Sequence, residues 1–343
     1  MMDEIIIKDL ENILNSIEKD FFKGKNFLVT GGAGFIGSWI CDALIKLNAN
    51  VTCLDNLSSG KSENIDHLFK YENFKFINED VTKYSGEENK RYDYILHLAS
   101  RASPEEYQKY PIETILANSL GSLNMLELAR KNNSIILFSS TSEIYGDAKI
   151  IPTPEEYWGN VNPIGPRSCY DESKRFSEAL FIAYQKQYGL DTRILRIFNT
   201  YGPRIRADGF YARVIPRFII QALNNKDITV YGNGTQTRSF CYISDTIEAI
   251  ILTIYKKEAK NEVINIGNPK EIKIIELAEK IKLLTKSNSK IIFKPLPPDD
   301  PKRRCPDISK ARKILNWYPK IELDEGLMKT IQWFIKFLPL SRI

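Results

Sequence analysis

Hydrophobic and polar positions along the chain fall into blocks that predict an α/β fold. Short apolar runs typical of buried strands occupy residues 26–30, 50–54, 74–77, 94–100 and 134–140. Between these runs, apolar residues recur at the three- and four-residue spacing of helices, as they do over 111–131. Strands that alternate with helices predict a parallel, doubly wound sheet of the Rossmann type, with helices on both faces.

The N-terminal segment 3–20 predicts an amphipathic helix ahead of the first strand. Apolar residues recur on one helical face at Ile6, Leu10, Ile13, Ile17 and Phe21. We expect this helix to pack on the body of the fold rather than to recruit a partner. Acidic residues near the start argue against a signal peptide, and no run approaches the roughly 18 apolar residues of a membrane-spanning helix. We therefore expect a cytoplasmic protein that does not enter a membrane.

A glycine-rich turn directly follows the first predicted strand and precedes a helix. Gly31 permits a tight turn, Gly34 lets backbone N–H groups approach a pyrophosphate, and Gly37 lets the helix pack closely on the strand. The second strand then ends in Asp55. This order of strand, glycine turn, helix, strand and acid is that of a dinucleotide-binding unit. Because Asp55 suits ribose hydroxyls and would repel the extra phosphate of NADP, the sequence predicts NAD as the cofactor.

Further cofactor contacts are expected where the next strands end. The third strand ends at Asp80 and Val81, a position suited to the adenine end of NAD. His97 lies inside the apolar fourth strand, and we interpret it as a packed core residue rather than a catalyst. The complete set of residues predicted to bind NAD is Gly31, Gly34, Phe35, Ile36, Gly37, Asp55, Asn56, Asp80, Val81, Leu98, Ala99, Tyr170 and Lys174.

Composition excludes several other classes of protein. The net charge of +5 is only mildly basic, and basic residues are not interleaved with aromatic ones as in nucleic-acid binders. Five cysteines without a C-x-x-C pair argue against a disulfide framework and a zinc ribbon. With two histidines, a His-rich metal site and a Ser-His-Asp hydrolase are also disfavoured. We expect a small-molecule partner, no nucleic acid and no metal.

The candidate catalytic residues follow the fifth strand. That strand runs into Thr141, at the edge of the sheet where ligands bind in such folds. Tyr170 and Lys174 are four residues apart, so they share one face of a predicted helix. A lysine and a nicotinamide cation near a tyrosine lower the phenol pKa from about 10 toward neutrality, which suits a general base acting on a sugar hydroxyl. Because all three residues are present, a catalytically silent NAD-binding scaffold is disfavoured.

The chain resembles the extended short-chain dehydrogenases/reductases of the NAD-dependent epimerase/dehydratase family over about residues 24–335. The stretches that carry the resemblance are 141–147, 157–165, 169–175, 196–204, 234–240 and 299–307. The resemblance implies that Thr141 binds the C4 hydroxyl of a nucleotide sugar. It also implies a smaller C-terminal lobe that holds the substrate.

The residues after Thr141 distinguish branches of this family. A 4,6-dehydratase would carry Asp-Glu next, and a 4-epimerase usually carries small or apolar residues. Ser142 and Glu143 are similar to the branch that decarboxylates UDP-glucuronate, where the glutamate and an arginine matching Arg304 handle the sugar carboxylate. An arginine fork suits a planar carboxylate, which supports a uronic acid substrate.

The resemblance therefore implies an NAD-dependent UDP-glucuronate decarboxylase. Oxidation at C4 gives a 4-ketone, CO2 leaves, C5 is reprotonated by a water or an acid near Ser142 and Glu143, and hydride return gives UDP-xylose. The implied catalytic residues are Thr141, Ser142, Glu143, Tyr170, Lys174 and Arg304. The implied substrate-binding residues are Asn199, Arg213, Tyr231, Arg238 and Arg304.

We expect three segments: the N-terminal helix at 1–22, a mainly NAD-binding domain at 23–198, and a mainly nucleotide-sugar-binding lobe at 199–343, interleaved with it. The resemblance also implies a homodimer formed through the helix that bears Tyr170. Two features depart from the decarboxylating branch, a longer segment around 207–216 and Arg101 in place of a small residue or proline. UDP-hexuronate or UDP-hexose 4-epimerisation and 4,6-dehydration therefore remain alternatives, as does release of the 4-keto pentose.

Overall fold

A seven-stranded parallel sheet lies at the centre of the computed structural model, which describes residues 3–15, 17–207 and 213–337. Its strand order is β11-β6-β5-β4-β1-β2-β3. The strands are β1 (Asn26–Thr30), β2 (Asn50–Leu54), β3 (Phe74–Ile77), β4 (Tyr94–His97), β5 (Ile135–Thr141), β6 (Thr192–Ile197) and β11 (Val263–Ile266). All neighbours pair in parallel, which confirms the predicted sheet. The order reverses between β1 and β4, the kind of switch point where ligands bind in such folds.

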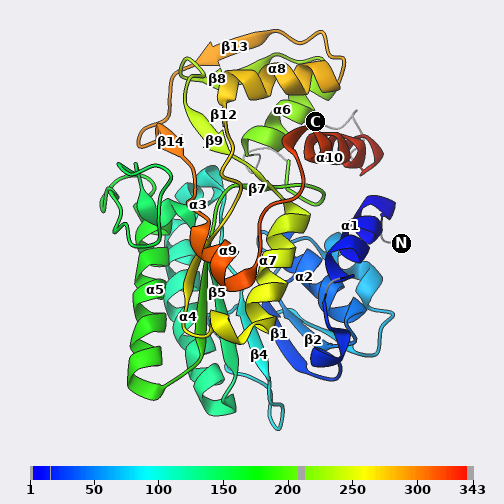
Figure 1. The fold of residues 1–343 in the computed structure, drawn as a ribbon, viewed down its shortest axis with the longest axis vertical. Coiled ribbons are helices and arrows are strands. Elements are labelled where there is room, and N and C mark those ends of the chain that lie inside the picture. The colour runs from blue at the N-terminus through cyan, green and yellow to red at the C-terminus, as the bar shows by residue number, and fades with distance from the viewer. Residues whose placement is uncertain (1–2, 16, 208–212, 338–343) are drawn as a thin grey trace.

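Helices cover both faces of the sheet (Figure 1). The helices α2 (Phe35–Lys46) and α7 (Ile243–Tyr255) pack on one face, and α4 (Pro111–Asn132) and α5 (Ser168–Tyr188) pack on the other. Side chains of a strand alternate between the two faces of a sheet. Phe27 and Val29 of β1 accordingly enter the core under α2 and α7, whereas Leu28 enters the core under α4 and α5.

A second group of elements lies over the end of the sheet where the parallel strands finish (Figure 1). It contains α6 (Val214–Leu223), β8 (Ile228–Tyr231), β9 (Thr237–Ser239), β12 (Glu271–Lys273), α8 (Ile274–Leu284), β13 (Ile291–Lys294), β14 (Arg303–Arg304) and α10 (Leu323–Phe337). The short strands β7 (Thr200–Tyr201) and β10 (Cys241–Tyr242) connect the two groups, whereas α3 (Pro104–Lys109) lies between β4 and α4, and α9 (Ser309–Leu315) packs against α7 and β11. The chain enters the second group with α6, β8 and β9 and then returns to the sheet with α7 and β11.

The N-terminal helix packs on the body of the fold, as predicted, but it is shorter than predicted. Helix α1 (Glu4–Leu14) buries its apolar face against α7 and ends with Asn15 as its C-cap, and a separate 3-10 helix covers Lys19–Phe21. Asparagine favours helix ends because its side chain competes for backbone hydrogen bonds. Buried Asp9 accepts a 2.8 Å hydrogen bond from Tyr242 and pairs at 2.8 Å with Lys329 of α10.

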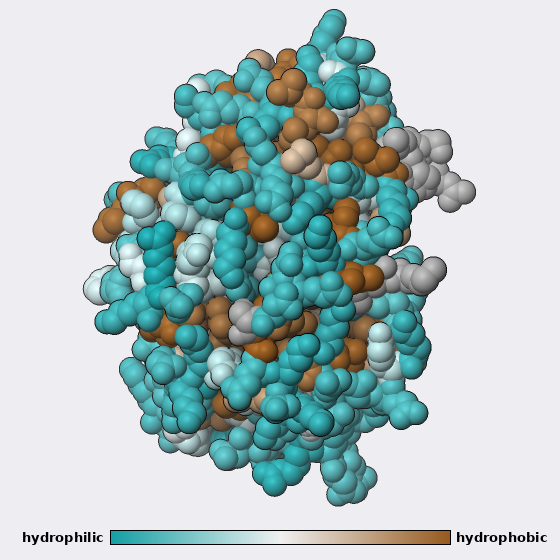
Figure 2. All heavy atoms as spheres, turned by 45° about the vertical axis from the view of Figure 1, so that its right-hand side comes forward, coloured by the Kyte–Doolittle hydropathy of each residue, from teal (hydrophilic) through white to brown (hydrophobic). Residues whose placement is uncertain are grey.

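The surface on the side of α1 and α10 is mostly hydrophilic, with hydrophobic atoms in separate patches (Figure 2). No helix in the described ranges is long and apolar enough to cross a bilayer. Within the longer segment noted at 207–216, residues 208–212 lie outside the described residues.

The fourth strand also ends earlier than predicted, at His97 instead of residue 100. The backbone N–H groups of Leu98 and Ala99 donate to the Thr30 hydroxyl, at 3.2 and 3.1 Å. The N–H group of Leu98 also donates to the backbone carbonyl of Thr30 at 3.2 Å, whereas Ala99 bonds to the Thr30 hydroxyl, so the regular ladder ends here.

Candidate active site

A cavity of about 770 Å³ opens between the ends of the strands and the second group of elements. Every residue predicted above to be catalytic, cofactor-binding or substrate-binding lines this cavity. The structure thus brings together residues that are up to 273 positions apart, since Gly31 and Arg304 share one space.

Glycines shape the dinucleotide side of the cavity. Gly31 has a φ of +69°, and a Cβ atom on it would lie 2.8 Å from the Cα of Ala99. A Cβ atom on Gly37 would lie 2.1 Å from the carbonyl oxygen of Gly31. Gly34 is the N-cap of α2 and offers no side-chain cap, so the positive end of the helix faces the cavity. This cradle, which a Cβ would fill, fits the diphosphate of a dinucleotide.

Asp55 fastens the glycine turn from the end of β2. It is buried and accepts hydrogen bonds from the backbone N–H groups of Ala33, at 3.0 Å, and Leu57, at 2.8 Å. Burial raises the pKa of Asp55 above its ordinary value, although both backbone bonds oppose the shift. A carboxylate accepts about four hydrogen bonds, so Asp55 retains capacity for ribose hydroxyls. At the neighbouring strand end, Asn56 donates to Asp80 at 2.7 Å.

Tyr170 and Lys174 lie on one face of α5, and both are buried. The Lys174 ammonium donates to the carbonyl of Ser139 at 2.8 Å and lies 5.8 Å from the centre of the Tyr170 ring. Burial lowers the pKa of Lys174 to about 7. Thr141 ends β5 beside this face and forms a hydrogen bond with Tyr170.

Without the nicotinamide cation that the prediction includes, the protein's own groups do not lower the pKa of Tyr170. Burial raises the pKa of Tyr170 to about 12, and the charge of Arg213 and the hydrogen bond with Thr141 oppose this only in part. Desolvation of the phenolate therefore outweighs the nearby positive charges. A pKa near neutrality requires further positive charge, which the nicotinamide ring of NAD would bring.

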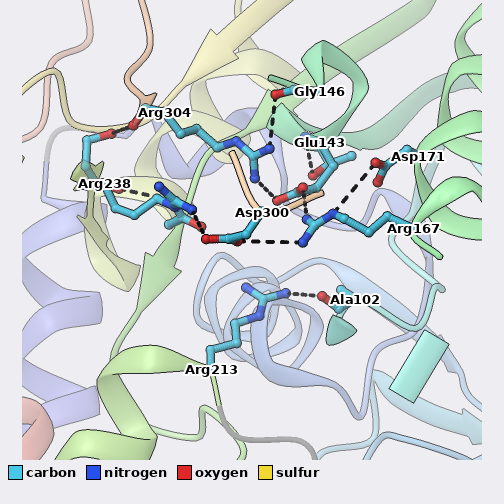
Figure 3. A network of polar contacts seen from close by, with 12 residues as sticks. Ala102, Glu143, Gly146, Arg167, Asp171, Arg213, Arg238, Asp300 and Arg304 are labelled. Carbon is cyan, nitrogen blue, oxygen red and sulfur yellow. Dashed lines mark hydrogen bonds and ion pairs between the residues drawn. The ribbon is translucent and has the colours of Figure 1, made fainter. Parts of the chain in front are cut away.

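Glu143 lies between two arginines (Figure 3). One carboxylate oxygen accepts from Arg304 and the other from Arg167, while Arg304 also reaches the carbonyl of Gly146 at 3.4 Å. Burial alone would raise the pKa of Glu143, but Arg167 and Arg304 outweigh it and lower that pKa to about 2. Glu143 therefore carries no proton at neutral pH, so of the two proton sources predicted for C5, a water fits and this acid does not.

Sequence reasoning missed two members of this network. Arg167 lies one helical turn before Tyr170, so it projects from the same face of α5, and that spacing was available in the sequence. Asp300 accepts a 2.8 Å bond from Arg238 and lies 4.0 Å from Arg167. No local pattern indicates Asp300, because both of its partners are distant in sequence.

The predicted substrate residues line the cavity from the second group of elements and its connections. The Asn199 amide donates to the carbonyl of Ser239 at 3.4 Å. Arg213 donates to the carbonyl of Ala102 at 3.0 Å, which leaves most of its guanidinium donors for other partners. Tyr231 packs its ring against the guanidinium of Arg217, 4.6 Å from the ring centre, so Arg217 is a further basic residue that sequence reasoning missed.

Comparison with known proteins decides the family. The sequence model of the NAD dependent epimerase/dehydratase family matches residues 27–267. The chain belongs to this family.

Relatives within the epimerase/dehydratase family include named decarboxylases. UDP-glucuronic acid decarboxylase 1 of Danio rerio is 46% identical over 314 residues, which cover 92% of this chain and 73% of the Danio protein. UDP-glucuronic acid decarboxylase 3 of Arabidopsis thaliana is 48% identical over 301 residues, which cover 88% of this chain and 86% of that protein.

Solved structures similar to this member of the family include 4-epimerases. UDP-N-acetylglucosamine 4-epimerase from Methanobrevibacter ruminantium aligns with a TM-score of 0.84 and 36% identity, covering 92% of this chain and 99% of that one. UDP-glucuronic acid 4-epimerase from Bacillus cereus, in complex with UDP-glucuronic acid and NAD, aligns with a TM-score of 0.80 and 30% identity, covering 91% and 99%. These neighbours share the fold and its arrangement of sheet and lobe.

His97 lies in the core of the fold. His97 is fully buried, and its ring nitrogens bond to Thr30 at 2.9 Å and Ser122 at 3.1 Å, which confirms it as a core residue. Burial lowers its pKa to about 3. Within the described ranges, no group of three or more His, Cys, Asp and Glu side chains is placed to hold a metal ion.

The raised pKa of Asp171 predicts that the stability of the fold depends on pH. Asp171 is buried behind Arg167, and its Oδ1 atom has no hydrogen-bond partner. Burial and the charge of Glu143 raise the pKa of Asp171 to about 7, so the folded state holds the proton more tightly than the unfolded state. The stability from this proton is complete below pH ~4 and is lost as the pH rises through ~7.

Asp171→Asn is therefore expected to raise the free energy of unfolding at pH 8 by about 1 kcal/mol and to leave it nearly unchanged at pH 4. Urea unfolding at both pH values measures the difference. Glu172→Gln is the matched control, because the Glu172 side chain is 40% exposed and pairs with Arg175 at 3.4 Å. Equal pH slopes in Asp171→Asn and the wild type would contradict the shifted pKa.

Proposed function

We propose that this chain decarboxylates UDP-glucuronate to UDP-xylose with bound NAD. The observation that carries the proposal is the Glu143 carboxylate held by Arg304 and Arg167, in the same cavity as Tyr170 and Lys174. This pairing suits a carboxylated sugar, because guanidinium groups bind planar carboxylates in a fork. Named UDP-glucuronic acid decarboxylases that are 46% and 48% identical to the chain support the same activity.

The residues of this chain divide the first half of the reaction between them. When bound, NAD accepts a hydride from C4 of the sugar and later returns it. The phenol oxygen of Tyr170 takes the proton of the C4 hydroxyl, and the hydroxyl of Thr141 orients that group. Lys174, with a pKa of about 7, adds positive charge beside the phenol when it is protonated. Asp55 and the Gly31–Gly37 turn hold the cofactor.

The second half depends on the arginines. A ketone at C4 makes the C5 carboxylate a β-keto acid, so its C–C bond breaks with release of CO2 and the electron pair enters an enolate. Arg304 orients the carboxylate, and oriented donors stabilise the developing enolate charge. Because Glu143 is ionised, a water near Ser142 and Glu143 supplies the proton to C5. The nucleotide end is held by Arg238, which binds the diphosphate, and by Arg213, Asn199 and Tyr231.

A UDP-hexuronate 4-epimerase is the second candidate, since the solved structures similar to this chain include a UDP-glucuronic acid 4-epimerase. A panel of UDP-glucuronate, UDP-glucose and dTDP-glucose separates the candidates once the products are identified, because a decarboxylase converts UDP-glucuronate to UDP-xylose and CO2 whereas a hexuronate 4-epimerase converts it to UDP-galacturonate. We expect UDP-glucuronate alone to be converted. Conversion of UDP-glucose to UDP-galactose would favour an epimerase, and loss of water from dTDP-glucose would favour a 4,6-dehydratase.

We further propose a homodimer formed through α4 and α5. Phe176 of α5 is 51% exposed. Five exposed apolar side chains also form one stripe along α4: Ile112, Ile115, Leu116, Leu120 and Leu123. Exposed stripes of this kind are typical of interfaces. Leu116→Glu is expected to convert the dimer to a monomer in analytical ultracentrifugation, with Lys109→Glu as a control for added charge. A wild-type protein that sediments as a monomer would contradict the proposal.

A cytoplasmic location is also proposed. All five cysteines are buried and free, as is common for proteins of reducing compartments. Cell fractionation tests the location, and recovery with a membrane or secreted fraction would contradict it.

A further inference from the structure

Asp300 connects the two ends of the arginine network (Figure 3). It lies in the proline-rich segment 295–301, between β13 and β14. Its Oδ2 atom accepts from Arg238 at 2.8 Å, and its Oδ1 atom lies 4.0 Å from Arg167. One carboxylate thus faces two guanidinium groups from different parts of the fold.

Arg238 is a buried cation that needs a counter-ion. Its side chain is 10% exposed, and burial lowers its pKa, which reflects the cost of keeping the charge away from water. Its other hydrogen bond goes to the neutral carbonyl of Thr237, at 2.8 Å. Among the described residues, Asp300 is the carboxylate that forms an ion pair with Arg238. Glu143 is bound by Arg304 and Arg167 and forms no ion pair with Arg238 in that part of the chain.

We propose that Asp300 is an internal stand-in for the substrate diphosphate: it neutralises Arg238 until the nucleotide binds, and the diphosphate then displaces it. The inference rests on the proposed function, in which Arg238 binds the diphosphate of a UDP-sugar. Asp300 acts through Arg238, so it is a positioning residue whose charge sets the affinity for the diphosphate. Its neighbourhood permits the exchange, because Asp300 lines the cavity and its side chain is 25% exposed.

An increase in UDP affinity on substitution of Asp300 distinguishes this proposal from one in which Asp300 only helps Arg238 to bind UDP. In Asp300→Asn, Arg238 loses its counter-ion, and an unpaired buried charge destabilises the free protein. Bound UDP replaces the missing charge, so UDP should bind about three- to tenfold more tightly than to the wild type. The Tm of the free variant should fall by about 2–4 °C, and saturating UDP should remove that deficit. Uridine, which lacks phosphates, should bind both proteins equally.

Isothermal titration of UDP and of uridine into the NAD-loaded full chain measures these affinities. Asp299→Asn is the matched control, because Asp299 contacts the amide of Asn162 at 3.1 Å, and its substitution should leave UDP affinity unchanged. Asp300→Ser serves in place of Asp300→Asn if that variant does not fold. Weaker or unchanged UDP binding in the variant would overturn the proposal. Failure of the wild type to bind UDP would instead contradict the proposed substrate class.

Discussion

Tyr170→Phe is expected to lower kcat for UDP-glucuronate by about 10³-fold. The substitution removes only the phenol oxygen, which is the atom proposed to take the C4 hydroxyl proton. The ring remains in place, because Tyr107 stacks parallel to it with ring centres 5.0 Å apart. Lys174 keeps its bond to the carbonyl of Ser139, so the cofactor side of the cavity should be intact.

Steady-state kinetics and NAD titration of Tyr170→Phe test this prediction together. The NAD affinity should stay within about threefold of the wild type, since the glycine turn and Asp55 are untouched. Tyr184→Phe is the matched control on the same helix, because the Tyr184 hydroxyl bonds to Glu127 away from the cavity. If Tyr170→Phe kept near-normal kcat, another group would have to be the base.

Arg304→Ala is expected to lower kcat/KM for UDP-glucuronate by about 10²- to 10³-fold. Removal of this guanidinium takes away the proposed fork for the sugar carboxylate. It also leaves Glu143 with one of its two arginine partners. Arg304→Lys should recover only part of the loss, because an ammonium keeps the charge without the planar fork.

Binding of UDP and of UDP-glucuronate to Arg304→Ala shows which part of the substrate Arg304 contacts. UDP has no sugar carboxylate, so its affinity should change far less than that of UDP-glucuronate. Arg303→Ala is the matched control, since Arg303 is exposed and pairs with Glu271. An equal loss of affinity for UDP and UDP-glucuronate would place Arg304 at the nucleotide rather than at the carboxylate.

Much of the fold follows from local sequence patterns. Apolar runs locate β1, β2 and β3 at the residues predicted, and the Gly31–Gly37 turn follows from its place between a strand and a helix. The end of α1 differs from prediction because Asn15 caps the helix, and the end of β4 differs because a contact outside the local pattern determines it. For β4, the deciding contact is the hydroxyl of Thr30, which binds the backbone of Leu98 and Ala99.

Most residues of the candidate site could be predicted from the sequence, but their charge states could not. The predicted residues line one cavity, because motifs at the ends of parallel strands meet at one edge of the sheet. The charge states depend on burial and on partners distant in sequence. Burial therefore raises the pKa of Tyr170 in the absence of the nicotinamide cation, and two arginines lower that of Glu143. The ion pair between Asp300 and Arg238 likewise joins two residues that are distant in sequence.

The fate of the sugar carboxylate distinguishes decarboxylation from epimerisation. The pure protein, loaded with NAD, is incubated with UDP-glucuronate that carries carbon-13 at the carboxylate, and NMR follows the label while absorbance follows NADH. We expect the label to leave as CO2 and bicarbonate, UDP-xylose to form in equal amount, and no net NADH to accumulate. Label retained in UDP-galacturonate as the sole product would contradict decarboxylation and establish an epimerase.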